Sequence, residues 1–182
     1  MFQITYPALV AAISLVWVLI RGSIAAKQRR LDWKRELQLM LVYICIIVVA
    51  RFTFFPFGTV DGKVQPLVFD AALMFPPRIN LLPLVYLLDY EVLWEAKLNV
   101  IGNVTMFMPI GIVWPVVFKQ LNTHGKVIAA GAGFSMAIEI LQLPFFDRVT
   151  DVDDLILNSL GFVAGYGIYL LVKKVASLCR RK

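Results

Sequence analysis

Five long apolar stretches divide this chain, and they constrain its fold more than any other feature. They run near residues 4–20, 37–55, 98–118, 127–146 and 155–172. A helix needs about 20 mostly apolar residues to cross a bilayer, and stretches of roughly 17–25 residues suffice. In lipid, the backbone polar groups of such a segment must pair internally, as they do in a helix. The pattern therefore predicts an all-α integral membrane protein, a bundle of about five transmembrane helices.

Composition argues against the main alternatives. Hydrophobic residues make up 60% of the chain, against roughly 45–50% in soluble domains. A soluble fold of 182 residues has too little interior to hide that much apolar surface. The net charge of +6 first suggests nucleic acid, but the basic residues cluster between and after the apolar stretches, as they do in loops beside a membrane. We therefore expect no nucleic-acid partner.

The distribution of basic residues sets the expected orientation. Most of the 18 Lys and Arg residues fall in three segments, at 21–35, 119–126 and 173–182. Cytoplasmic loops carry an excess of positive charge, so the N-terminus is expected outside and the C-terminus in the cytoplasm. No Lys or Arg precedes the first stretch, which favours an uncleaved membrane helix over a signal peptide.

The segment between the second and third stretches is long and is expected on the outer side. It contains turn and breaker signals such as Asp61-Gly62 and Pro76-Pro77. Its apolar pieces, near 66–75 and 81–88, are too short to span a bilayer and predict a re-entrant or interfacial outer loop. Since no repeat or low-complexity linker interrupts the chain, one domain over residues 1–182 is the expected organisation.

Small residues recur four positions apart in the last two stretches. The pairs are Gly131 with Ser135, Gly133 with Ala137, and Gly161 with Gly165. Small side chains let helix backbones approach closely in lipid. We expect these pairs to pack helices of one chain together rather than to join two copies.

Charged and amide side chains gather near the predicted outer ends of the helices. Asn99 and Asn103 share one helix face, and Glu139 and Gln142 share another. Such groups are costly in lipid and usually mark a function or a buried polar network. An up-and-down bundle brings these helix ends to one depth, which predicts a polar pocket that opens outward. Its candidate ligand-binding residues are Arg51, Arg78, Asn80, Asn99, Asn103, Glu139, Gln142, Arg148, Asp151, Asp153, Asp154 and Asn158.

A purely structural role is the alternative for these residues. Arg51 or Arg148 would then pair with Glu139, and the acidic run 151–154 would cap the fifth helix, because acidic side chains favour helix N-termini. That run also offers oxygen ligands for Mg²⁺ or Ca²⁺, but it lacks the EF-hand spacing. We therefore expect no metal and no cofactor.

The sequence does not decide whether the protein is an enzyme. No Gly-rich phosphate loop precedes a strand, and no Ser sits in a nucleophile elbow. His124 is the only histidine, and it is expected on the opposite side of the membrane from the polar pocket. A Ser-His-Asp arrangement is therefore not expected, and the catalytic residues, if there are any, stay unknown.

Several of these segments together resemble the VanZ-like membrane protein family. Residues 99–111 resemble its first signature, and residues 135–142 with 148–161 resemble the second. With Arg51 and residues 80–83 upstream, the similarity covers about residues 39–171. The recurrent residues of the family fall here on Asn99, Gly102, Asn103, Phe107, Pro109, Gly111, Glu139, Gln142, Arg148, Asp151, Asp153, Asp154, Asn158 and Gly161.

The resemblance implies a bacterial cytoplasmic-membrane protein linked to low-level resistance to teicoplanin-type glycopeptides and lipoglycopeptides. The expected partners are membrane lipids, with a lipid headgroup, a lipid-linked cell-wall precursor or the antibiotic as the pocket's ligand. Arginines would suit phosphate, and amides would suit sugar hydroxyls. An enzyme that modifies a lipid or cell-envelope component at the outer leaflet is the alternative, with Glu139 or Asp154 as general base. A transporter is less favoured, because no inverted repeat is visible. The oligomeric state is left open.

Overall fold

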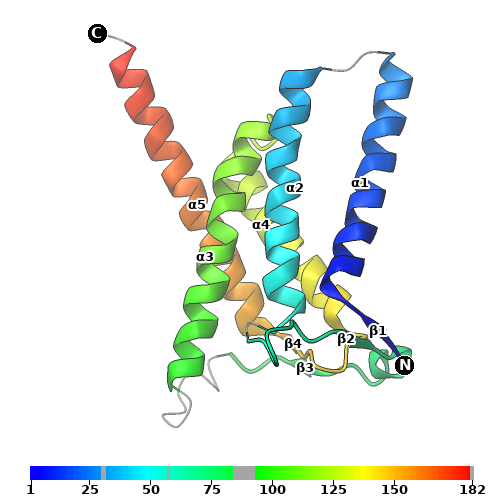
Figure 1. Ribbon diagram of the computed structural model, residues 1–182. Coiled ribbons are helices and arrows are strands. Elements are labelled where there is room, and N and C mark those ends of the chain that lie inside the picture. The colour runs from blue at the N-terminus through cyan, green and yellow to red at the C-terminus, as the bar shows by residue number, and fades with distance from the viewer. Residues whose placement is uncertain (30–31, 57, 84–92, 181–182) are drawn as a thin grey trace. The chain divides into compact units, whose positions relative to one another are not determined.

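The computed structural model describes residues 1–29, 32–56, 58–83 and 93–180 (Figure 1). Within these residues the chain forms five long α-helices and a few short strands. The helices are α1 (Tyr6–Gln28), α2 (Trp33–Phe54), α3 (Leu93–Val117), α4 (His124–Gln142) and α5 (Val152–Cys179). The strands are β1 (Phe2–Ile4), β2 (Leu67–Phe69), β3 (Ile79–Asn80) and β4 (Thr150–Asp151), and a 3₁₀ helix, η1, covers Ala71–Met74. The predicted all-α membrane fold is confirmed.

Four of the described helices are long and apolar enough to cross a membrane: α1, α2, α3 and α5. Helix α4 lies in the fourth apolar stretch but is the shortest of the five, with 19 residues. It ends at Gln142, before the predicted end at residue 146, and Glu139, Gln142 and its glycines lower its hydropathy. The chain is therefore a multi-pass membrane protein, and α4 is the one long described helix that is not apolar enough to count among the candidate spans.

The described chain divides into two compact units, and each is described by itself. Unit 1 comprises Met1–Pro77 and Pro144–Arg148. In unit 1, β1 pairs antiparallel with β2, with Gln3 opposite Val68. The N–H of Phe146 donates to the carbonyl of Val68 over 2.9 Å, so the segment after α4 also lies against β2. The buried cluster of this unit is Phe55, Leu67 and Phe145.

The segment between α2 and α3, predicted as a re-entrant or interfacial outer loop, thus forms in part a small β structure. The apolar piece 66–75 forms β2 and η1, because its extended residues find backbone partners in β1 and near Phe146. Much of the second apolar piece, 81–88, lies outside the described residues.

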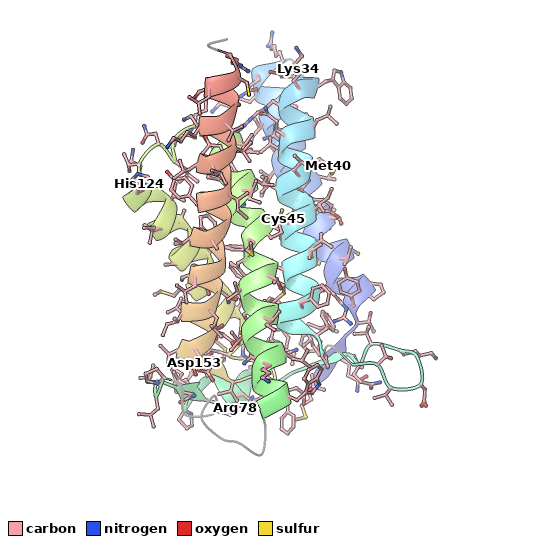
Figure 2. The ribbon with its side chains drawn as sticks, turned by 90° about the vertical axis from the view of Figure 1, so that its left-hand side faces the viewer. Lys34, Met40, Cys45, Arg78, His124 and Asp153 are labelled. Carbon is pink, nitrogen blue, oxygen red and sulfur yellow. The ribbon has the colours of Figure 1, made fainter. Side chains whose placement is uncertain are left out.

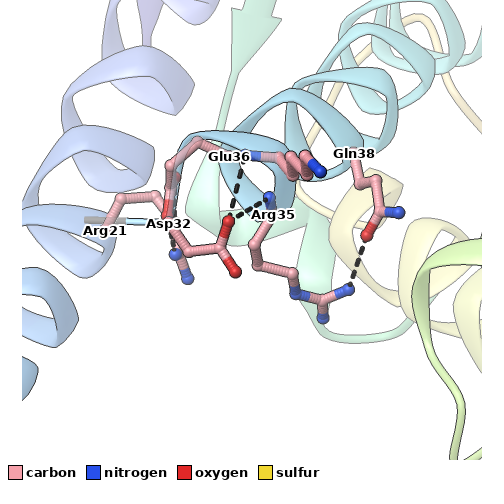
Figure 3. Close-up of polar contacts among 6 residues, drawn as sticks. Arg21, Asp32, Arg35, Glu36 and Gln38 are labelled. Carbon is pink, nitrogen blue, oxygen red and sulfur yellow. Dashed lines mark hydrogen bonds and ion pairs between the residues drawn. The ribbon is translucent and has the colours of Figure 1, made fainter. Parts of the chain in front are cut away.

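Polar contacts join helices α1 and α2 of unit 1 at the Arg21 end. Arg21 of α1 forms an ion pair with Glu36 of α2, and its Nε donates to Glu36 Oε2 over 3.0 Å. Asp32 caps α2 by accepting from the N–H groups of Lys34 and Arg35 (Figure 3). None of the described side chains of α1 is fully buried, although several, among them Leu9 and Trp17, are half-buried.

Unit 2 comprises Arg78–Leu143 and Val149–Lys182, and its core is a close contact between α3 and α5. A Cβ added at Gly161 would lie 2.2 Å from the carbonyl oxygen of Val104, and one at Gly165 would lie 2.0 Å from that of Met108. A Cβ at Gly111 would meet the carbonyl oxygen of Phe162 at 2.0 Å. Only glycine permits backbones to approach this closely. The Gly161–Gly165 pair therefore packs within the chain, as predicted.

Candidate functional site

A network of amides, carboxylates and a hydroxyl occupies one end of unit 2. We call it the polar cluster, and it consists of Asn80, Asn99, Asn103, Ser135, Glu139, Gln142, Asp151, Asp153, Asp154 and Asn158. Asp153 lies at the same end of the unit as Arg78, and His124 lies at the other end (Figure 2). The only histidine is therefore distant from the acidic residues within this unit, and its place on the opposite side of the membrane stays a prediction.

Asn103 connects α3 to α5. Its Nδ2 donates to Asn99 Oδ1 over 2.6 Å and to Asp154 Oδ1 over 2.6 Å. The first contact follows from the i, i+4 spacing of the two asparagines on α3. The second joins two helices whose backbones the glycines already hold close together. Both amide hydrogens of Asn103 therefore have acceptors, and its side chain is held in one orientation.

Asp151 is the centre of the second part of the network. It caps α5 by accepting from the N–H of Asp153 over 2.9 Å through Oδ1. Its Oδ2 accepts from Asn80 Nδ2 over 3.1 Å, and its own N–H donates to Glu139 Oε2 over 3.0 Å. The cap agrees with the preference of carboxylates for helix N-termini. The cap is the role that the purely structural alternative predicts for the acidic run. It is also compatible with ligand binding, because a capping residue can belong to a binding site.

The parallel pairing of β3 with β4 explains how Asn80 reaches this site. Asn80 stands opposite Asp151 in the pairing, and the N–H of Thr150 donates to the carbonyl of Arg78 over 3.1 Å. Thr150 also donates through Oγ1 to the backbone carbonyl of Glu139 over 2.9 Å. The segment before α5 is thus fixed to both the outer loop and the end of α4.

Asn158 and Ser135 form the deepest part of the cluster. Asn158 Nδ2 donates to Ser135 Oγ over 3.0 Å, and the two residues are 1% and 0% exposed. The carbonyl oxygen of Asn158, Oδ1, is buried and has no hydrogen-bond partner among the residues that the structure describes. Buried polar groups are nearly always paired, so this oxygen is unusual among the buried acceptors of the described cluster.

The two arginines Arg51 and Arg148 belong to unit 1. Arg51 donates to the carbonyl of Pro56 over 2.9 Å, and its guanidinium lies 5.8 Å from the ring centre of Tyr6. Arg148 Nε donates to the carbonyl of Phe54 over 3.0 Å. Both arginines therefore hold backbone carbonyls near the end of α2. Their predicted pairing with Glu139, which belongs to unit 2, stays a prediction.

Sequence reasoning missed the polar roles of Ser135 and Thr150. The small-residue pattern predicts only a packing role for Ser135, yet Ser135 lies one helical turn before Glu139 and is buried against Asn158. Its i, i+4 spacing from Glu139 was the available signal. Thr150 gave no such signal, because its bond to the Glu139 carbonyl depends on how the loop folds back.

No three His, Cys, Asp or Glu side chains within the described residues are placed to hold a metal ion together. The carboxylates of the cluster accept hydrogen bonds from amide side chains and from backbone N–H groups. The arrangement is rich in acceptor oxygens, which suits a ligand with hydroxyl, amide or ammonium donors. The binding role of these residues stays a prediction.

The family model that matches this chain is VanZ/LLP1, over residues 40–173. This range agrees with the expected 39–171 and contains all twelve candidate site residues. No curated protein and no solved structure matches the chain. Because the match covers most of the chain and the whole polar cluster, the chain belongs to the VanZ/LLP1 family.

Proposed function

We propose that this protein lies in the bacterial cytoplasmic membrane and that its polar cluster binds the polar head of a membrane-anchored molecule. Three ligands carry the hydroxyl, amide or ammonium donors that the cluster suits: a lipid headgroup, a lipid-linked cell-wall precursor and a lipoglycopeptide or glycopeptide antibiotic. Binding at the outer face would alter access of the antibiotic to its target. The protein would thereby contribute to resistance to teicoplanin-type glycopeptides.

The observation that carries the proposal is the carbonyl oxygen of Asn158. It is buried and lacks a hydrogen-bond donor among the described residues. Leaving such an acceptor unpaired costs roughly 1–3 kcal/mol. A donor from outside the chain would remove this cost, and the hydroxyl or ammonium group of a ligand is such a donor.

The residues above Asn158 support the same ligand chemistry. Glu139 is 4% exposed and its Oε2 accepts from a backbone N–H, while Asp154 accepts from Asn103. Carboxylates that already hold donors in fixed geometry are pre-organised acceptors. They favour a neutral or cationic group with several donors over a bare phosphate.

The charges of α5 support an outward position for the cluster. The helix begins beside Asp151 and ends beyond the exposed pair Lys173 and Lys174. Because basic residues concentrate on the cytoplasmic side, the opposite end of α5 belongs outside. An extracellular antibiotic or an outer-leaflet lipid would then reach the cluster directly.

The resistance part of the proposal is tested in a glycopeptide-susceptible host. Cells expressing the wild type are expected to show reduced susceptibility to teicoplanin and to a lipoglycopeptide. They are also expected to bind less of a fluorescent derivative of teicoplanin. Asn158→Leu should abolish both effects at equal expression. Asn122→Leu is the matched control, because Asn122 lies just before α4, at the end away from the cluster, and contacts Lys126. An active Asn158→Leu variant would overturn the role of the cluster.

The three ligands are separated by a binding measurement on purified protein. Native mass spectrometry with teicoplanin, with a lipid-linked wall precursor and with phosphatidylethanolamine, each added alone, should give one adduct that Asn158→Leu weakens at least tenfold. The molecule whose adduct is weakened by Asn158→Leu is the ligand of the cluster. If no adduct depends on Asn158 while the wild type still alters susceptibility, binding through this cluster is wrong and the resistance effect has another origin.

A further inference from the structure

A groove lies between α1 and α2 of unit 1, apart from the polar cluster. Its volume is about 340 Å³, and its described lining is wholly apolar. The lining residues are Ala12, Ile13, Val16, Trp17 and Ile20 of α1 and Ile46 of α2. An apolar cavity of about 150 Å³ is enough for a benzene-sized molecule, so this groove has room for a longer hydrocarbon.

The length of the groove matches one leaflet of a bilayer. Its lining on α1 runs from Ala12 to Ile20, which is about 12 Å at a rise of about 1.5 Å per residue. Half of a hydrocarbon core roughly 30 Å thick is about 15 Å. The groove ends directly before Arg21, whose ion pair with Glu36 marks the charged end. A lipid chain running along the groove would therefore have its headgroup at this end.

The contacts between the helices explain why the groove stays open. Arg21 holds Glu36 at the charged end, and further along Ser14 Oγ and Tyr43 Oη share a hydrogen bond of 2.6 Å. The rings of Trp17 and Tyr43 lie 5.5 Å apart. No described side chain of α1 is buried. Two polar contacts and one ring contact therefore join the helices, and the space between the lining residues stays open.

The charges beyond the Arg21 end of the groove favour an anion. Lys27, in the last turn of α1, and Lys34, in the first turn of α2, are both exposed. Arg21 is already paired with Glu36, and Arg29 and Arg35 lie near the lysines along the chain, so the described basic cluster at this end is larger than one ion pair. Basic clusters at the membrane surface attract anionic lipids.

We propose that this groove binds one acyl chain of an anionic phospholipid whose phosphate lies against Lys27 and Lys34. The site lies in the leaflet next to the α1–α2 connection. Its occupant would stabilise α1 against α2 by filling the space that their side chains leave.

Filling the groove tests the acyl-chain part of the proposal. The full chain is reconstituted in nanodiscs with equal amounts of phosphatidylglycerol and phosphatidylcholine that carry the same acyl chains. Lipids retained after release are then counted by native mass spectrometry. The wild type should retain one phosphatidylglycerol at least fivefold more often than phosphatidylcholine. Ala12→Phe should lower this retention at least fivefold, because the ring enters the groove.

Ala11→Phe is the matched control, since Ala11 neighbours Ala12 but does not line the groove. It should retain lipid as the wild type does. Equal retention in the two Phe variants, whether both high or both low, would show only general contact with surrounding lipid and would overturn the proposal. Helicity and elution volume of each variant confirm that it is folded.

Neutralising the lysines tests the headgroup part. The double variant Lys27→Gln, Lys34→Gln should lower the preference for phosphatidylglycerol at least twofold while still retaining one chain. Lys173→Gln, Lys174→Gln removes the same charge from the end of α5 and should keep the preference for phosphatidylglycerol. An unchanged preference in the first variant, or its loss in the second, would refute the assigned headgroup contact.

Discussion

Asn103 of α3 and Asp154 of α5 are joined by a hydrogen bond of 2.6 Å, at the end of the same helix pair that Gly161 and Gly165 hold in backbone contact. Close backbones place the two side chains within reach, and the amide then links a carboxylate to Asn99 as well. The packing of small residues and the geometry of the polar cluster therefore depend on each other.

The hydrogen bond between Asn103 and Asp154 predicts a measurable interaction free energy between the two side chains. Asn103→Ala removes the donor of a partly buried charged acceptor and should lower the free energy of unfolding by roughly 1–3 kcal/mol. A double-mutant cycle with Asp154→Ala, followed by thermal unfolding in detergent, should give a coupling energy of about 0.5–3 kcal/mol. Strictly additive effects would mean that the bond contributes nothing to stability.

The glycines of the α3–α5 contact should not tolerate a methyl group. Gly165→Ala would place a Cβ 2.0 Å from the Met108 carbonyl oxygen, so the helices must separate, and overpacking of this kind costs about 1–3 kcal/mol or more. Gly133→Ala is the control, because no described atom of another segment lies within 4 Å of its Cβ position. It should be neutral or stabilising by up to about 1 kcal/mol, since alanine favours a helix. Similar melting temperatures for the two variants would contradict the described contact.

Removing the Asn158 side chain together with its partner should abolish function without lowering stability. In the double variant Ser135→Ala, Asn158→Leu both partners of a buried hydrogen bond are lost together, and such replacements are often nearly neutral or stabilising. We expect a melting temperature at or above that of the wild type and loss of the reduced antibiotic susceptibility. A strong fall in stability would instead assign Asn158 to the structural framework.

The ion pair at the charged end of α1 and α2 should be rescued by exchange. Arg21→Glu places two carboxylates together and should weaken the α1–α2 contact, whereas Arg21→Glu with Glu36→Arg restores opposite charges. Crosslinking of Ser14→Cys with Tyr43→Cys by a short bifunctional maleimide in each background reports the contact, because Ser14 Oγ lies 2.6 Å from Tyr43 Oη and the linker spans the length of the lost ring. Crosslinking should fall in the single charge variant and recover in the exchanged one. Equal crosslinking throughout would show that the pair does not position the helices.

Labelling of two exposed positions tests the orientation of the protein in the membrane. Cys179 at the end of α5 is a free, exposed thiol, and it should react with a membrane-impermeant maleimide only after the cells are permeabilised. Asp147→Cys in a Cys179→Ser background should react in intact cells, because residue 147 is exposed and is expected outside. Labelling of Cys179 in intact cells would reverse the assigned sides.

The sequence by itself determined the helices of this protein and where its polar residues fall along them. Apolar stretches of spanning length become helices because lipid offers no partner for an unpaired backbone group. Spacing alone placed Asn99 beside Asn103, and the preference of carboxylates for helix N-termini predicted that the acidic run caps α5, a role that Asp151 fills.

Only the tertiary structure decided which distant groups meet. Asn80 reaches Asp151 through the β3–β4 pairing, Ser135 meets Asn158 across two helices, and residues after Gln142 leave α4 for β2. Periodicity reports which face of a helix a residue occupies. It does not report which other segment packs against that face, because that depends on side-chain volumes and backbone pairing between segments far apart in the chain.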